Sequence, residues 1–471
     1  MDKKTSLIFR ITLTAAVAGV LLWQVTTRSL VAYFANSAPE AALSLRSTDA
    51  KALLVLAERT LAQIQRPEHP TSNSPSQSAA TVKEPEERLQ GWAELASKAN
   101  SPQRGESLPG AAGAPPLDSR MNQQIRRWAE LALTNDPLNA RALSILGQLA
   151  HMAGDEVGVA NFLRAAAGRS IRESAAVYWL MRKSFESRDY TTALYCADIL
   201  LRTRSQANEY VMAVLLHMAE NEQTMGMLRD AVLNNPPWRS QFLSVHAQYA
   251  SDPRAPLELL LTLRDTPAPP TATDLRNYVN ALIGRKQYEL AYSAWLQFLP
   301  PELLSSTGFL FNGSFENVPS GLPFDWVIGE GSGVTIDIVQ RPDRDGERAL
   351  LIEFGYGRVD FRGVQQLTAL APGNYEFNAK YRGDISGKRG LVWRVACAET
   401  PGSPIGESQM ATGASPSWKD VVFSFSVPDT NCRAQYVRLV FDARMASEQL
   451  TSGSIFYDEL RIARVKERAR P

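Results

Sequence analysis

The sequence predicts a multidomain α + β protein made of an N-terminal transmembrane helix, an α-helical solenoid and a C-terminal antiparallel β-sandwich. Three observations predict this organisation. Residues 11–27 contain no charge over 17 positions, residues 121–304 follow a helical period with an internal repeat, and residues 309–465 alternate with a period of two. The chain has 471 residues, of which 44% are hydrophobic, which is enough to form two folded domains joined by tethers.

The uncharged segment at 11–27 is close to the shortest length that spans a bilayer. Three basic residues precede it and only Arg28 follows at once, so the positive-inside rule predicts a cytoplasmic N-terminus. We therefore expect residues 1–37 to be an uncleaved single-pass anchor in a bacterial inner membrane, with the bulk of the chain in the periplasm. A removed signal peptide is the alternative, although no convincing small-x-small cleavage site follows the segment.

The next two segments differ sharply in composition. Residues 38–65 predict a helix, because their leucines and isoleucine form a broad apolar stripe. Residues 66–118 are rich in Pro, Ser, Gly, Ala and Gln, which predicts a flexible linker that one short helix around 84–98 interrupts. We expect this linker to act as a tether that holds the helical domain away from the bilayer.

Residues 119–304 predict a helical repeat domain. The ten residues Leu146–Asp155 recur as Leu180–Asp189, an offset of 34, and the small residues Ala160 and Ala193 follow the two copies one position out of step. A 34-residue period is typical of a helix-turn-helix solenoid. The segment resembles the tetratricopeptide repeat family. That resemblance implies about four to six helix pairs that bind a protein partner in the cell envelope.

Residues 305–465 predict the β-sandwich, and residues 466–471 form a short basic tail that we expect to be solvated. Val421, Phe423 and Phe425 alternate with polar or smaller residues, which is the pattern of a half-buried strand. Similar runs separated by turn residues predict about eight strands in two antiparallel sheets.

The order of short motifs in this domain resembles the carbohydrate-binding modules of the family 4/9 type, which are galactose-binding-like jelly rolls. The motifs are Asn312-Gly313-Ser314-Phe315-Glu316, Phe324-Asp325-Trp326, Gly346-Glu347-Arg348-Ala349-Leu350, Val364-Gln365-Gln366, Pro372-Gly373-Asn374-Tyr375, Ser417-Trp418-Lys419 and Phe456-Tyr457-Asp458-Glu459-Leu460. The resemblance covers about one third of the chain. It implies a jelly roll that contacts a polysaccharide.

A sugar site needs flat aromatic side chains and planar polar groups that reach hydroxyls. Trp393 and Arg394 are neighbours on one predicted strand, so they point to opposite faces and only one of them can line the site. Trp326 and Trp418 are assigned to core packing instead. The candidate carbohydrate-binding residues are Tyr356, Arg358, Asp360, Gln365, Trp393 and Arg394, with Arg362 and Arg389 as further polar groups.

The same resemblance implies a structural calcium where the first and last strands meet. Glu316 and Asp458 occupy the positions that match the family's ligands. Calcium prefers several oxygen ligands, so two carboxylates brought together there are a plausible nucleus. The alternative is that Glu316 caps a turn and Asp458 accepts from backbone donors. No other cofactor is expected.

The chain has three cysteines. Cys397 and Cys432 both lie in the β-rich half, and a disulfide persists outside the cytoplasm, so we predict that these two are bonded. The alternative is a pair of buried free thiols. Cys196 lies among apolar helical residues and is expected to be buried and inert.

Several functional classes are excluded by composition. The net charge of +1 gives no basic field for nucleic acid. The four histidines lack metal-ligand spacing and none lies in the β-domain, so neither a zinc site nor a hydrolytic triad is predicted.

The sequence therefore predicts a non-catalytic, inner-membrane-anchored periplasmic scaffold or binding protein in cell-surface polysaccharide assembly or export. The alternatives are a glycan-active enzyme or its accessory subunit, with Asp325 or Asp360 as carboxylates to test, and an envelope scaffold that binds protein alone.

Overall fold

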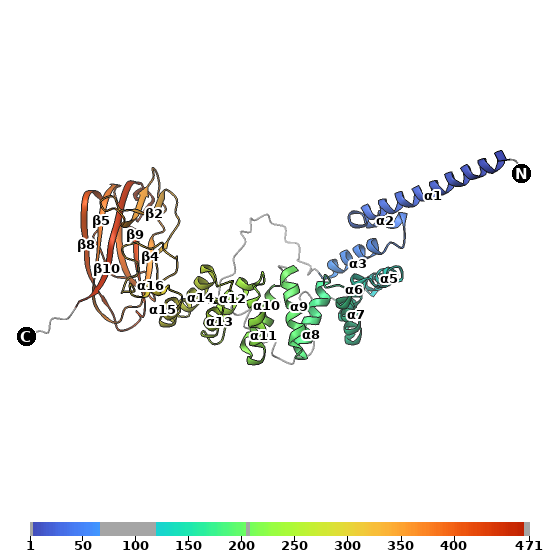
Figure 1. The fold of residues 1–471 in the computed structure, drawn as a ribbon, viewed down its shortest axis with the longest axis horizontal. Coiled ribbons are helices and arrows are strands. Elements are labelled where there is room, and N and C mark those ends of the chain that lie inside the picture. Colours follow the sequence, from blue (N-terminus) through green and yellow to red (C-terminus); the bar gives the residue numbers. More distant parts are fainter. Residues whose placement is uncertain (1–2, 66–118, 204–207, 466–471) are drawn as a thin grey trace, which may run out of the picture. The chain divides into compact units, whose positions relative to one another are not determined.

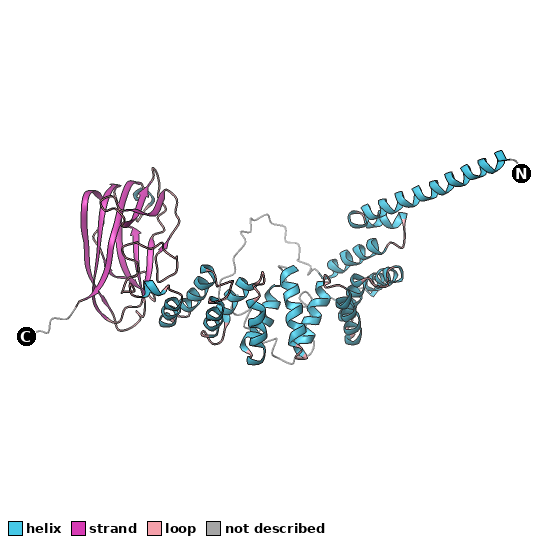
Figure 2. Cartoon of the chain, in the orientation of Figure 1, coloured by secondary structure: helices cyan, strands magenta, loops and turns pink. Residues whose placement is uncertain are grey.

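The computed structural model describes residues 3–65, 119–203 and 208–465 (Figure 1). The expected linker at 66–118, its short helix at 84–98 and the basic tail at 466–471 lie outside the described residues. The chain divides into two compact units, Met1–Trp238 and Arg239–Pro471. The first unit is helical, and the second contains both helices and the β-domain (Figure 2).

Helix α1 spans Lys3–Ser37, and its segment Ala16–Ser37 is long and apolar enough to cross a membrane. A signal sequence near an N-terminus passes the same test. The end of α1 packs on the next two helices, because Val31 and Ala35 share a buried cluster with Ala42 and Ala52. The end of this candidate membrane span is thus part of the first compact unit.

The single helix expected over 38–65 is in fact two helices, α2 (Pro39–Leu45) and α3 (Ala50–Gln65). The chain leaves the helix at Arg46, and the side chain of Asp49 accepts a hydrogen bond of 3.0 Å from the Ala52 amide. Asp at this position caps a new helix, because it satisfies an amide that has no partner within the helix. The apolar stripe did not reveal this turn.

Helix α3 packs against α5 (Ser119–Asn135), which follows it across the segment 66–118. Leu54 and Leu61 of α3 are buried with Ile125 and Ala129 of α5 in one cluster. The helices on either side of the predicted tether therefore pack directly on each other. Residues 66–118 connect two helices that pack together, because α3 needs a partner for its apolar face.

The 34-residue repeat is confirmed by the helix bounds. Helices α6 (Ala140–Met152) and α7 (Glu156–Arg169) are followed by α8 (Ser174–Glu186) and α9 (Tyr190–Thr203), and every bound of the second pair lies 34 residues after that of the first. The turns also match. Gly154 and Arg188 both have positive φ, at 72° and 63°. The residue after each caps the next helix by accepting an amide hydrogen bond three residues on.

The slip of one residue in the sequence repeat has a structural explanation. The residue equivalent to Ala193 is Val159 and not Ala160, because Val159 and Ala193 both lie five residues after the positive-φ residue. Val159 and Ala193 are both buried, whereas Ala160 is half-buried. The repeat is therefore in step, with a valine at the first copy's closely packed position.

The remaining helices continue the pattern less regularly. Cys196 in α9 is a buried free thiol, and burial raises its pKa to about 11, so it stays protonated at neutral pH. The first unit ends with α10 (Asn208–Glu220) and α11 (Glu222–Leu233). The second unit begins with α12 (Arg239–Tyr249), α13 (Ala255–Arg264), α14 (Ala272–Gly284), α15 (Tyr288–Gln297) and α16 (Pro301–Leu304).

The β-domain consists of two five-stranded antiparallel sheets, which confirms the predicted sandwich. Sheet A has the order β1 (Val327–Ile328), β4 (Val364–Thr368), β9 (Gln435–Phe441), β6 (Leu391–Cys397) and β7 (Pro404–Glu407). Sheet B has the order β2 (Val334–Gln340), β3 (Arg348–Phe354), β10 (Thr451–Arg464), β5 (Gly373–Gly387) and β8 (Gly413–Val427). The sandwich has ten strands where about eight were expected. Strands β1 and β7 are too short to show a period of two in the sequence.

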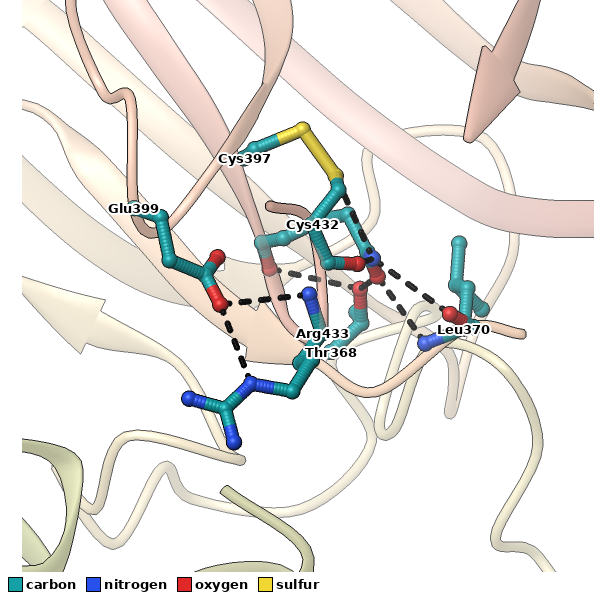
Figure 3. The surroundings of a disulfide bond; sticks show 7 residues. Thr368, Leu370, Cys397, Glu399, Cys432 and Arg433 are labelled. Atoms are coloured by element: carbon teal, nitrogen blue, oxygen red, sulfur yellow. Dashed lines mark hydrogen bonds and ion pairs between the residues drawn. A yellow bond between two sulfur atoms is a disulfide. The ribbon is translucent and has the colours of Figure 1, made fainter. Parts of the chain in front are cut away.

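The predicted disulfide between Cys397 and Cys432 is present and joins the end of β6 to the segment before β9 (Figure 3). Beside it, Arg433 forms an ion pair of 3.5 Å with Glu399. The Arg433 guanidinium also lies 5.5 Å from the centre of the Tyr288 ring in α15. The disulfide therefore stabilises the edge of the sandwich that faces this helix.

Candidate functional site

A row of polar side chains crosses the outer face of sheet A. Gln365 of β4 lies opposite Arg438 of β9, Arg438 lies opposite Arg394 of β6, and Arg394 lies opposite Glu407 of β7. Residues directly opposite each other in a sheet point to the same side. The alternate residues of β9, Val437 and Leu439, are fully buried in the core, so the row points away from it.

The basic side chains of this face are held by a chain of ion pairs. Arg394 bonds Glu407 at 3.1 Å and Asp442 at 2.6 Å, while Arg389 bonds Asp442 at 3.4 Å and Glu448 at 3.2 Å. Burial opposes the charge on Arg394, but the bonds to Asp442 and Glu407 raise its pKa above the ordinary value. These contacts fix the direction of both guanidinium groups before any ligand arrives.

Arg438 differs from the other two arginines. Its guanidinium lies 4.1 Å from the centre of the Tyr436 ring, and its Nε is buried without a hydrogen-bond partner. Burial lowers the pKa of Arg438, because a charged group loses solvation there. No carboxylate within the described ranges pairs with it.

Trp393 is not part of this face. Its side chain is 1% exposed and lies in the core against the rings of Trp326, Phe377 and Tyr457. The expectation that Trp393 forms a sugar platform is therefore wrong. Because successive residues of a strand point to opposite faces, its burial places Arg394 outside, as one of the two open alternatives required.

Tyr356, Arg358 and Asp360 lie in the segment between β3 and β4. Tyr356 is fully exposed, whereas Arg358 donates to Gln449 at 2.5 Å and Asp360 pairs with Arg362 at 3.1 Å. The segment is fixed by the buried side chain of Val359 and by backbone bonds to residues 332 and 449. The bond to Gln449 brings this segment beside the one that carries Glu448. Tyr356 is its exposed aromatic side chain.

The two expected calcium ligands each have a partner from the protein. Glu316 accepts a hydrogen bond of 3.1 Å from the amide of Arg348, the first residue of β3, so it holds a distant strand and does not cap a local turn. Asp458 is 2% exposed and accepts from Arg341 at 2.5 Å and from the Glu459 amide at 2.6 Å. Burial raises the pKa of Asp458, and both bonds oppose that rise.

These surroundings do not fit calcium. The Arg341 guanidinium already supplies a positive charge against Asp458, and it also contacts Asp343 and Glu459. No group of three or more His, Cys, Asp or Glu side chains able to hold a metal occurs in the part of the chain that the structure describes. We therefore assign Asp458 to a buried ion pair with Arg341.

Sequence reasoning missed Arg438, Tyr436 and Asp442. A signal was present, because Tyr436 and Arg438 alternate with Val437 and Leu439 in a strand that was otherwise predicted correctly. What the sequence does not give is the register that brings β9 between β4 and β6.

Comparison with known proteins gives no relative in sequence and several in structure. No family model and no curated protein matches the chain. A family 4 carbohydrate-binding module is 14% identical, covers 33% of this chain and 99% of its own, with a TM-score of 0.25. A putative sugar-binding protein from Bacteroides thetaiotaomicron is 11% identical, covers 34% and 100%, with a TM-score of 0.25. A family 61 module solved with β-1,4-galactotriose is 18% identical, covers 34% and 100%, with a TM-score of 0.24. All three match the β-domain.

Proposed function

We propose that this chain is a non-catalytic, membrane-anchored binding protein whose β-sandwich holds a polysaccharide on the outer face of sheet A. The single observation that carries the proposal is the cross-strand row of Gln365, Arg438 and Arg394. Planar amide and guanidinium groups on adjacent strands match the hydroxyls of successive sugar rings. The side-chain amide of Gln365 makes no hydrogen bond to another residue in the described ranges, so it is available to a ligand.

The row is suited to binding because it is preorganised. Arg394 and Asp442 are 34% and 17% exposed in their side chains, so they face solvent while their ion pair fixes them. A site whose side chains are already oriented loses less conformational entropy when the ligand binds. Tyr356, exposed on the neighbouring segment, supplies an aromatic face in this proposal.

The absence of catalysis is also part of the proposal. The carboxylate of Asp325 is buried and accepts from the Ser320 amide and hydroxyl and from the Trp326 amide. Asp360 is paired with Arg362. Both acids therefore have structural partners, which supports a binding role over hydrolysis by a pair of facing carboxylates.

We place the folded units outside the cytoplasm, in the periplasm of a bacterium, and in the assembly or export of cell-surface polysaccharide. The disulfide supports this location, because such bonds are rare in the reducing cytoplasm. Helix α1 would be the anchor. An alkaline phosphatase fusion after residue 471 should be active in cells, and activity of a cytosolic reporter alone at that position would contradict the topology.

The helical units would bind a protein partner. Helices α6 to α9 repeat every 34 residues with matching turns, which is the behaviour of tetratricopeptide-like arrays. Stacked helix pairs present an extended surface that suits a protein ligand. Photo-crosslinking from exposed Tyr195 in α9 should trap one envelope protein, whereas crosslinking from Val422 in sheet B should not trap it.

The glycan proposal is tested with the full-length protein in detergent and a panel of bacterial polysaccharides, by affinity electrophoresis. Arg394→Ala and Gln365→Ala should each weaken retention about tenfold, the loss expected for one hydrogen-bonded contact. Arg382→Ala is the matched control, because Arg382 lies on β5 of the other sheet. Retention of no polysaccharide by the wild type, or equal loss in the control, would overturn the proposal.

A further inference from the structure

The three arginines of the outer face of sheet A have unequal partners. Arg394 contacts two carboxylates, those of Glu407 and Asp442, and Arg389 likewise contacts Asp442 and Glu448. Arg438 lies directly opposite Arg394 and has only the face of Tyr436. Within the described ranges it is the arginine of this row that lacks an acidic partner.

This arrangement is unfavourable without a ligand. Burial weakens the solvation of the Arg438 guanidinium, and no carboxylate within the described ranges offsets that loss. A buried arginine normally pairs with a carboxylate, and an exposed arginine keeps its hydration. An anion bound to Arg438 would offset this cost.

The geometry also selects the kind of anion. A guanidinium binds a carboxylate through two parallel N–H···O bonds made at its edge, whereas the Tyr436 ring lies over the face of Arg438. Gln365, on the other side of Arg438, presents an amide suited to hydroxyl groups. A sugar that carries both a carboxylate and hydroxyls matches this pair.

We infer that the polysaccharide is acidic and that Arg438 binds the carboxylate of a uronic acid residue, with Gln365 contacting neighbouring hydroxyls. This inference rests on the proposed function, since it names the class of glycan for the same face of sheet A. Arg394 then acts as a second, already neutralised contact and fixes the position of the ligand.

The experiment compares each polyuronate of a panel, including polygalacturonate and polyglucuronate, with its carboxyl-reduced form. The two forms have the same linkage and differ only in the charged group. Wild-type full-length protein should bind the preferred polyuronate about 10-fold to 100-fold more tightly than the reduced polymer, the range for a charge-assisted pair.

Variants then assign the effect to Arg438. Arg438→Gln should lose that preference and bind the native and the reduced polymer with similar affinity. Arg438→Lys keeps the charge without the fork and should recover only part of the preference. Arg382→Gln on sheet B is the matched control and should behave as wild type. Thermal unfolding of each variant shows that the sandwich is intact.

The outcomes separate this inference from the function on which it rests. Equal binding of native and reduced polymers by the wild type would overturn the acid preference and leave glycan binding in place. Binding of neither form would overturn the proposed function together with it. Dextran sulfate distinguishes attraction to any polyanion, because a ranking by charge density alone, unchanged in Arg438→Gln, would also overturn the inference.

Discussion

Arg341 is a buried arginine of the β-domain whose charge has several acidic partners. Its side chain is 2% exposed, it bonds Asp458 at 2.5 Å and Asp343 at 3.0 Å, and it lies 4.2 Å from the centre of the Trp418 ring. The pair connects the end of β2 with β10, which is where the family resemblance implies a metal. A guanidinium provides the positive charge there.

Replacing this arginine should be strongly destabilising. Arg341→Met leaves Asp458 buried without its cation, and loss of one partner of a buried ion pair costs about 3 to 5 kcal/mol. Urea unfolding of the full-length protein measures the change in free energy of unfolding. The double variant with Asp458→Asn should recover part of the loss, since it also removes the stranded charge.

The ion pair between Arg341 and Asp458 also predicts how the protein responds to calcium. Calcium chloride and EDTA should leave the midpoint of thermal unfolding of the wild type unchanged, because a ligand stabilises a fold only where it binds. A midpoint that rises with calcium concentration would show a site that uses other groups than this pair.

For single residues, the sequence predicts which residues are bonded or buried better than it predicts the face of a strand to which a side chain points. The Cys397–Cys432 pair and the buried Trp326 are confirmed. The choice between Trp393 and Arg394 was open, because it depends on which parity of the strand faces the core. Arg438 could not be selected at all, since its lack of a carboxylate depends on register with two strands distant in sequence.

Helices α3 and α5 behave as one more helix pair at the start of the array. The turn before α3 and the turn before α6 have the same bonds, with Asp49 accepting from Ala52 and Asn139 accepting from Ala142. An ion pair between Glu58 and Arg141 links α3 to α6. The segment 66–118 therefore replaces the short turn found between α6 and α7.

This pairing predicts that the two fragments produced by a cut within residues 66–118 stay associated. A protease site introduced at residue 90 should give two fragments that co-elute in detergent, because the α3–α5 cluster is formed by buried side chains on both sides of the cut. Leu61→Asp, which places a charge in that cluster, should make the cut fragments separate. Separation of the wild-type fragments would contradict the pairing.

The disulfide between Cys397 and Cys432 should contribute measurably to the stability of the sandwich. Chain-entropy arguments for a separation of 35 residues give a stabilisation of about 3 to 4 kcal/mol. The double variant Cys397→Ala, Cys432→Ala should lose that amount in urea unfolding, and dithiothreitol should reproduce the loss in the wild type alone. A double variant that remains sensitive to the reductant would show that another thiol is responsible.

Element boundaries were predicted well where a single period dominates and poorly where partners are remote. The long strands of the sandwich and the helices α6 to α9 follow directly from alternation and repeat. The association of α3 with α5 was missed, because the composition of the intervening segment indicated a tether and no local signal connects helices across it.

The second unit couples its helices to the sandwich through one aromatic cluster. Trp295 of α15 is 2% exposed and lies 5.2 Å from Phe311 and 5.8 Å from Phe324, ring centre to ring centre. Tyr292 contacts Phe324 as well. Contacts of this size make helices and sheet one cooperative body and not two domains on a flexible joint.

Removing the Trp295 ring should therefore separate the unfolding of the helices from the unfolding of the sandwich. Trp295→Ala should cost about 3 to 5 kcal/mol and split the calorimetric transition of the second unit into a helical and a β component. Tyr195→Ala, an exposed ring in the first unit, is the control and should change stability by less than about 0.5 kcal/mol. One unchanged transition in Trp295→Ala would contradict the coupling.

The burial of Val31 and Ala35 against Ala42 and Ala52 bears on processing of the leader. A peptidase that cut after Ala35 would remove the part of α1 that covers α2 and α3. Ala42 and Ala52 would then be exposed to water. The apolar helix α1 thus also covers the end of the first unit, so a cut after Ala35 would destabilise the helices beneath it.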